Sequence, residues 1–201
     1  MPLIGLTGGY ACGKSLVLRG FVERGAHGID CDRIAREITA KGEPGLEKIA
    51  GEFGQGFLLA DGGLNRAHLA SLIFNDEAAR KRLEGLLHPI IFSRVYSRAE
   101  GIMRKDSQAV VVVDAPLLYE AGMEERMDKV VVVTCPLVAR MERGMARDRI
   151  SREQAAARIA AQTPLEEKAA RADYVIDNSG APERTAQMIS DVWEKIAALR
   201  K

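Results

Sequence analysis

A phosphate-binding loop is indicated near the start of the chain. The spacing G-x-x-x-x-G-K-S/T is met by Gly8-Gly9-Tyr10-Ala11-Cys12-Gly13-Lys14-Ser15. Glycines let several backbone N–H groups turn toward one point, and the helix that follows adds the positive end of its dipole. In this pattern Lys14 bridges the β- and γ-phosphates of a nucleotide, and the Ser15 hydroxyl ligates Mg²⁺. We therefore expect ATP along Gly8 to Leu16; the alternative is a chance match in a glycine-rich turn.

Two carboxylates follow the second expected strand. Asp30 and Asp32 flank Cys31, and alternate residues of an extended segment point the same way. Ligands of open α/β sheets lie beyond the carboxyl ends of the strands. Either carboxylate could therefore orient an acceptor hydroxyl and take its proton during phosphoryl transfer. The alternative is that one of them caps the helix that begins near Arg33. We expect at least one of the two to contact the substrate.

An arginine-rich helix is expected in the second half of the chain. Arg140, Arg143 and Arg147 are spaced three and four residues apart, so they share one helix face. Arginine forks match phosphate oxygens and suit the charge that develops in phosphoryl transfer. We expect Arg143 and Arg147 to contact phosphate. The alternative for most of these positions is a solvated helix laced with salt bridges.

A third carboxylate, Asp114, follows the apolar run 109–113. Its place resembles that of a Walker B carboxylate, which would hold Mg²⁺ through water. It could equally cap the turn at Pro116. The sequence leaves these two interpretations open.

The elements that must position these residues alternate between strand and helix. Apolar or β-branched runs predict strands, and periodic apolar residues predict helices; Ser151 and Gln154 have the spacing of a capping box. The expected strands are 3–6, 27–29, 109–113, 129–134 and 174–176, and the expected helices are 15–24, 34–39, 136–148, 151–162 and 181–201. From residue 42 to 104 the pattern is helical, apart from a possible short strand at 57–59.

This alternation predicts an α/β fold. We expect a parallel sheet flanked by helices, like that of P-loop NTPases, formed by residues 1–41 and 105–201. A helical lid at about 136–165 belongs to this nucleotide-binding core. Residues 42–104 are expected to form a helical insertion between two strands of the sheet.

Composition excludes several classes of protein. The 201 residues carry a formal net charge of +1, which argues against a general nucleic-acid footprint. Only 5% of the residues are aromatic, too few for base-stacking platforms. No apolar run is long enough to span a membrane, and three scattered cysteines form no disulfide framework. We expect a soluble cytoplasmic protein, a monomer or weak homo-oligomer with no nucleic-acid or membrane partner.

Taken together, the motifs resemble those of the dephospho-CoA kinase family, which carries out the last step of coenzyme A biosynthesis. Beyond the phosphate loop and the acidic segment 29–36, the matches include His88-Pro89-Ile90, Arg143 with Arg147-Asp148, and Val175-Ile176-Asp177-Asn178-Ser179-Gly180. The chain departs from the usual family pattern at Ala11, Cys12, Leu16 and Cys31.

The resemblance implies that ATP gives its γ-phosphate to the ribose 3′-hydroxyl of dephospho-CoA. It implies Asp32 as base or orienting group, with Lys14 and Arg143 stabilising the transferred phosphoryl group. It implies that the insertion at 42–104 is a helical substrate domain that binds CoA. His88 would lie in this domain, where it contacts the acceptor or satisfies a helix end. The alternative is another small-acceptor P-loop kinase, of the nucleoside-monophosphate or shikimate type.

Overall fold

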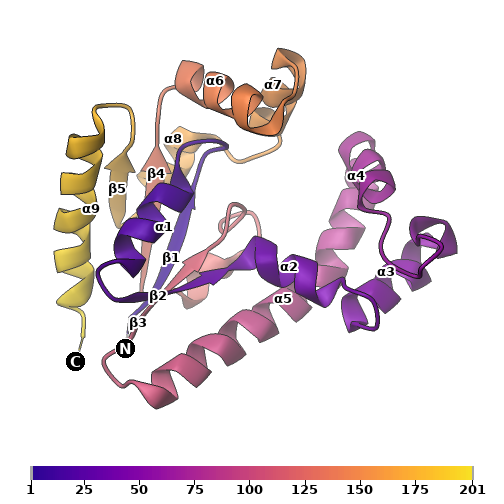
Figure 1. The fold of residues 1–201 in the computed structure, drawn as a ribbon, viewed down its shortest axis with the longest axis horizontal. Helices are drawn as coiled ribbons and strands as arrows, with labels where there is room; N and C mark the ends of the chain where they lie inside the picture. Colours follow the sequence, from indigo (N-terminus) through magenta and orange to yellow (C-terminus); the bar gives the residue numbers. More distant parts are fainter. Residues whose placement is uncertain (1, 201) are drawn as a thin grey trace. The chain divides into compact units, whose positions relative to one another are not determined.

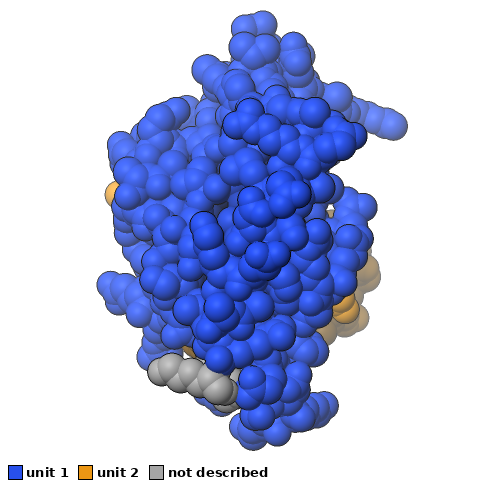
Figure 2. Space-filling view, turned by 90° about the vertical axis from the view of Figure 1, so that its left-hand side faces the viewer, with its two compact units in different colours: residues 1–29, 99–201 blue, residues 30–98 orange. Residues whose placement is uncertain are grey.

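The computed structural model describes residues 2–200 and divides the chain into two compact units. The first unit contains the described residues up to Ile29 and those from Ala99 onward, and the second unit is Asp30–Arg98 (Figure 2). The expected insertion at 42–104 and its role as a substrate domain stay predictions. The second unit as observed begins earlier, at the residue that ends the second strand.

A five-stranded sheet forms the core of the first unit, in the order β2-β3-β1-β4-β5 (Figure 1). Its strands are β1 (Leu3–Gly8), β2 (Ala26–Asp30), β3 (Val110–Asp114), β4 (Lys129–Thr134) and β5 (Tyr174–Asp177). The pairs β1·β3, β1·β4 and β4·β5 are parallel. Because β3 and β4 are valine runs buried along nearly their whole length, they suit the interior of such a sheet.

The register brings three strand ends to one edge of the sheet. Leu6 of β1 lies opposite Asp114 of β3 and opposite Val131 of β4. Parallel strands finish at the same edge, so the ends of β1, β3 and β4 are neighbours. The phosphate loop therefore emerges between the residues that follow two other strands.

Helices of the first unit pack around this sheet, with α9 contacting both α1 and β5 (Figure 1). They are α1 (Lys14–Val22), the 3₁₀ turn η2 (Met123–Arg126), α6 (Leu137–Asp148), α7 (Arg152–Ala160), α8 (Leu165–Ala170) and α9 (Pro182–Ala197). The capping box at Ser151 and Gln154 is present with both of its hydrogen bonds. The short helix α8 and the turn η2 were not expected from the sequence.

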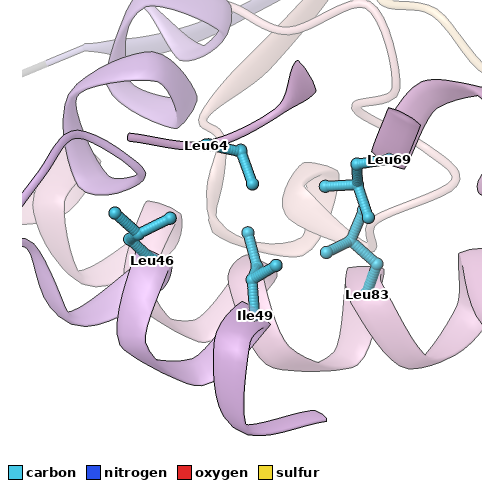
Figure 3. Close-up of a cluster of buried hydrophobic side chains, with 5 residues drawn as sticks. All are labelled: Leu46, Ile49, Leu64, Leu69 and Leu83. Atoms are coloured by element: carbon cyan, nitrogen blue, oxygen red, sulfur yellow. The ribbon is translucent and has the colours of Figure 1, made fainter. Parts of the chain in front are cut away.

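The second unit is helical, as the pattern predicts. Its elements are α2 (Cys31–Ile38), α3 (Pro44–Phe53), the 3₁₀ turn η1 (Gln55–Phe57), α4 (Arg66–Asn75) and most of α5 (Glu77–Lys105), which continues along the chain into the first unit. The possible strand at 57–59 is reduced to a single antiparallel bridge between Leu58 and Leu64. This unit has its own apolar cluster, in which five buried side chains from α3, the loop before α4, α4 and α5 point toward one another (Figure 3): Leu46, Ile49, Leu64, Leu69 and Leu83.

Candidate active site

The phosphate loop leaves β1 at Gly8 and enters α1 at Lys14. Gly13 adopts φ +90°, a left-handed conformation that glycine tolerates without strain. Ala11 is also left-handed, at φ 58°, which costs a residue with a Cβ about 1–2 kcal/mol. Among the residues that the structure describes, no side chain caps the start of α1. The free N–H groups at the start of this helix are therefore available to a phosphate.

An asparagine from the far end of the chain supports the loop. Asn178, buried just after β5, donates from Nδ2 to the Cys12 carbonyl oxygen at 2.8 Å. Its Oδ1 accepts from the Thr185 hydroxyl at 3.2 Å. A Cβ at position 13 would lie 2.2 Å from Asn178 Nδ2, so only glycine fits there. Spacing arguments alone did not single out Asn178; its only sequence signal was the match at the end of the family pattern.

Lys14 and Ser15 lie at the start of α1. The Lys14 ammonium forms an ion pair with the Asp114 carboxylate, which is buried at the end of β3. Ser15 is exposed, so its hydroxyl is accessible to a ligand. The structure thus brings together Asp114 and the loop, which the sequence placed 100 residues apart. It tests neither the Mg²⁺ role nor the capping role expected of Asp114.

The three helix arginines reach different partners. Arg140 is buried, and its Nε donates to the Tyr10 carbonyl oxygen at 3.4 Å. Arg143 donates from both terminal nitrogens to the Asn178 carbonyl oxygen, each at 3.2 Å. Arg147 instead forms an ion pair with its neighbour Asp148, with Nε to Oδ1 at 2.7 Å. All three arginines therefore contact the loop or its supporting residue, Arg147 through the ring of Tyr10.

Tyr10 connects the loop to α6 and to the end of α7. Its hydroxyl donates to Asp148 Oδ2 at 2.5 Å, and its backbone N–H donates to Gln162 Oε1 at 2.8 Å. The Arg147 guanidinium lies 5.2 Å from the centre of its ring. Gly144 is packed so closely that a Cβ there would lie 2.3 Å from the ring. These contacts of Tyr10 with Gly144, Arg147, Asp148 and Gln162 form a joint between the phosphate loop and the region of α6 and α7.

This joint has a strong electrostatic component. Hydrogen bonds from Arg147, together with one from Tyr10, hold the pKa of Asp148 well below its usual range despite some desolvation. Arg158 also forms an ion pair with Asp148. Burial and the hydrogen bond to Asp148 raise the pKa of Tyr10, because a tyrosinate would lose that hydrogen bond and face the negative charge of Asp148. Tyr10 is therefore a neutral donor and Asp148 an ionised acceptor.

The two residues of the acidic pair have different local structures. Asp30 is the N-cap of α2, and its Oδ1 accepts from the Arg33 N–H at 3.0 Å. The expectation of an extended segment through Asp32 is wrong, because α2 already begins at Cys31 and places Asp32 in its first turn. The cause is the Asp30 cap itself, which starts the helix three residues earlier than expected. Asp32 is left exposed.

His88 lies in the interior of α5, beside Pro89. Its ring stacks on that of Phe92, with centroids 5.7 Å apart. Burial lowers the pKa of His88, and nearby Glu84 offsets part of that effect. The suggestion that His88 satisfies a helix end is wrong, since the helix continues for several turns on either side. A contact with the acceptor stays a prediction.

The phosphate loop, its supporting asparagine and the arginine-bearing helix stand at the carboxyl edge of a 2-3-1-4-5 sheet. This is the architecture of the small-molecule kinases that carry a P-loop. A shikimate kinase from Acinetobacter baumannii, at 16% identity, shares the fold with a TM-score of 0.54 over 98% of this chain and 94% of that one.

The match to one family of such kinases extends over nearly the whole chain. The dephospho-CoA kinase family model matches residues 2–183. A dephospho-CoA kinase of Geobacter sulfurreducens is 46% identical over 97% of this chain and 98% of that protein. The solved dephospho-CoA kinase of Campylobacter jejuni has a TM-score of 0.72 at 30% identity, covering 98% and 97% of the two chains, and a solved Thermus thermophilus protein reaches 0.81 at 33%, covering 96% and 97%. The chain belongs to the dephospho-CoA kinase family.

Proposed function

We propose that this protein transfers the γ-phosphoryl group of ATP to the ribose 3′-hydroxyl of dephospho-CoA, giving coenzyme A and ADP. The observation that carries the choice of acceptor is the family match across the length of the chain, at 46% identity to a dephospho-CoA kinase. The phosphate loop and its support argue for a nucleoside triphosphate as donor.

Binding of the donor falls to the phosphate loop. The backbone from Gly8 to Leu16 and the start of α1 bind the phosphate oxygens. Lys14 exchanges Asp114 for the β- and γ-phosphates when ATP enters, since both partners are anionic. Arg143 and Arg147 add positive charge from α6, where a guanidinium matches phosphoryl oxygens in two-point geometry.

Activation of the acceptor falls to Asp32. An exposed carboxylate in the first turn of α2 is free of the capping task that Asp30 performs. Asp32 orients the 3′-hydroxyl and accepts its proton as the new P–O bond forms. Asp30 and His88 contribute to acceptor binding.

The oxygen donors at the loop fit Mg²⁺. No group of three or more His, Cys, Asp or Glu side chains gathers into a metal cage anywhere within residues 2–200. Mg²⁺ does not need such a cage, because it keeps waters and binds substrate phosphates beside one or two protein oxygens. The exposed Ser15 hydroxyl supplies one oxygen, and Asp114 could supply a second through water. When bound, the ion neutralises charge on the β- and γ-phosphates.

The helices of residues 2–200 include none long and apolar enough to cross a bilayer. The family relationship supports a protein that meets its substrates in the cytoplasm, and we expect a monomer or weak homo-oligomer.

An acceptor comparison tests the proposal. ATP consumption by the full chain is measured with dephospho-CoA, shikimate and a set of nucleoside monophosphates. We expect strong stimulation by dephospho-CoA alone, with phosphorus NMR of the product showing a new 3′-phosphomonoester. Stimulation by shikimate or a monophosphate, without any by dephospho-CoA, would overturn the proposal in favour of the other kinase type.

A further inference from the structure

Two thiols meet at the carboxyl edge of the sheet. Cys12 lies in the phosphate loop that follows β1, and Cys135 directly follows β4. These strands are neighbours, with Gly8 opposite Val133. The Cys12 sulfur lies beside the Arg140 guanidinium, since a Cβ placed on Gly9 would be 2.9 Å from both. Arg140 lines one cavity with Cys135, and the side chains of the two cysteines interact. Both residues are buried and neither is in a disulfide.

The surroundings of the two thiols make them chemically unequal. The hydrogen bond from Cys12, with the charges of Arg143 and Arg140, lowers the pKa of Cys135 to about 7 against the opposing effects of burial and Asp177. The pKa of Cys12 is raised, because Cys12 gives its proton to that hydrogen bond and is buried. Cys135 is therefore the nucleophile of the pair.

A cavity gives small molecules a route to Cys135. It has a volume of about 420 Å³, and Cys135 lines it together with Arg140 and Leu165. Asp177 and Ser179 form part of the same wall. A hydroperoxide is small and polar, so it can enter a cavity of this size and approach the sulfur beside Arg140. Cys12 is only 1% exposed, so the hydroperoxide reacts with Cys135 and Cys12 reacts afterwards with the oxidised Cys135.

From this geometry we propose that Cys12 and Cys135 are a redox pair, which a hydroperoxide converts to an intramolecular disulfide that disables the phosphate loop. The effect on kinase activity rests on the proposed function, whereas disulfide formation does not. Nothing in the phosphoryl-transfer chemistry described above uses either thiol.

The reaction balances in two steps. The Cys135 thiolate attacks one oxygen of the hydroperoxide: an S–O bond forms, the O–O bond breaks, and water or an alcohol leaves with a proton from solvent. The Cys12 sulfur then attacks the Cys135 sulfenic acid: the S–S bond forms, the S–O bond breaks, and the Cys12 proton leaves with the hydroxyl as water. The two sulfurs lose two electrons and the peroxide gains them. A dithiol reverses the reaction by exchange.

The disulfide would change the loop because of where Cys12 stands. The two sulfurs must move from hydrogen-bond contact to a bond of about 2.05 Å. Cys12 adjoins Gly13 at the start of α1, and its carbonyl is bound by Asn178. Drawing this residue toward β4 redirects the N–H groups that bind phosphate. We therefore expect the oxidised protein to bind ATP at least tenfold more weakly.

The test uses the full chain and hydrogen peroxide at pH 7. The expected product is a single disulfide-linked peptide pair containing Cys12 and Cys135, found by mass spectrometry under non-reducing conditions. ATP binding, measured by equilibrium dialysis, falls at least tenfold and returns after dithiothreitol. Cys135→Ser removes the cross-link and keeps ATP binding after peroxide, while Cys31→Ser behaves as the parent because Cys31 lies outside the pair.

Three results would overturn the proposal: a cross-link through Cys31, no cross-link at all, or a Cys12–Cys135 disulfide with unchanged ATP affinity. If circular dichroism shows that Cys135→Ser does not fold, Cys135→Ala replaces it as the variant that cannot form the cross-link. The peptide map of the parent protein tests disulfide formation without any variant. A reduced chain that does not bind ATP would count against the proposed function, and the peptide map would still report on the thiols.

Discussion

The two aspartates at the end of β2 and the start of α2 have different tasks. Asp30 is committed to the backbone of α2 through the Arg33 N–H. Asp32, two residues on, is exposed in the first helical turn. An exposed carboxylate that is not engaged in capping is what a proton acceptor for a hydroxyl requires.

Replacing Asp32 with asparagine tests this role. Asp32→Asn keeps the shape and removes the basic oxygen, so kcat should fall about 10²-fold or more while the Kd for ATP stays near that of the parent. Turnover and ATP binding are measured separately. Asp61→Asn, the same change in an exposed turn of the same unit, should leave both unchanged. Parent-like turnover of Asp32→Asn would leave Asp32 without a catalytic role.

At the residue scale, sequence reasoning is strongest where spacing fixes the backbone. The loop motif identified Lys14 because eight consecutive residues determine its local geometry. The pairing of Lys14 with Asp114 and the support from Asn178 span 100 and 166 residues. Such contacts follow from strand order and register, which local spacing does not encode.

At the scale of elements, Tyr10 couples the phosphate loop to α6 and to Gln162, which lies just after the end of α7. Its ring, hydroxyl and backbone N–H all contact this region. The arginines expected to bind phosphate are on α6, so their placement over the loop depends on this joint. A residue of the loop therefore helps to position cationic side chains more than 130 residues away along the chain.

Removing one hydroxyl tests the joint. Tyr10→Phe loses a hydrogen bond to an ionised acceptor, worth about 1–3 kcal/mol. We expect faster amide hydrogen exchange in α6 and α7 and a several-fold higher KM for ATP, with the melting temperature lowered by only a few degrees.

Tyr119→Phe is the matched control, since the buried Tyr119 hydroxyl has no hydrogen-bond partner among the described residues. It should leave exchange in α6 and α7 unaltered. If the two variants behave alike, the hydroxyl of Tyr10 does not hold the joint.

The elements differ in how far the sequence determined them. The strand at Lys129–Thr134 has the predicted bounds, because a run of four valines between polar residues admits few alternatives. The helix α8 has six residues and follows Pro164. It is too short for a periodic pattern, and it is held by long-range contacts such as the buried Lys168 ammonium with Glu120 at 2.8 Å. Propensity could not reveal it.

At the scale of the whole molecule, a net charge of +1 conceals ion pairs of the first unit. Three of the carboxylates in these ion pairs have lowered pKa values. In Glu120, burial is outweighed by Lys168 and the Thr163 N–H; in Asp173, burial is outweighed by Lys129 and the Val130 N–H; in Asp148, the hydrogen bonds of Arg147 dominate. Each carboxylate is thus bound more tightly as an anion in the folded state.

These lowered pKa values predict loss of stability in acid. A carboxylate with a depressed folded pKa stabilises the fold fully above its ordinary pKa of 3.8 for Asp or 4.5 for Glu, and ever less as pH falls toward the folded pKa. The free energy of unfolding in urea should therefore be level near pH 6 and decline below about pH 4.5. Asp173→Asn should be less stable at pH 6 and show a shallower decline. A profile that is flat down to pH 3 would contradict this account.

Separate cores predict separate responses to a cavity. Ile49 is fully buried in the cluster of the second unit (Figure 3), and Ile196 of α9 is fully buried in the first. Truncating a buried isoleucine to alanine costs about 2–5 kcal/mol. Because each side chain stabilises the core that it fills, Ile49→Ala should reduce amide protection chiefly between residues 30 and 98, and Ile196→Ala chiefly outside that range.

The pair of variants forms its own control, since the chemical change is the same and only the core differs. Hydrogen exchange read by mass spectrometry at peptide resolution separates the two cases, because opening of one unit need not expose the amides of the other. If both variants lowered protection equally throughout the chain, the units would unfold as one cooperative body. In that case the two compact units of the fold would not be separate units of stability.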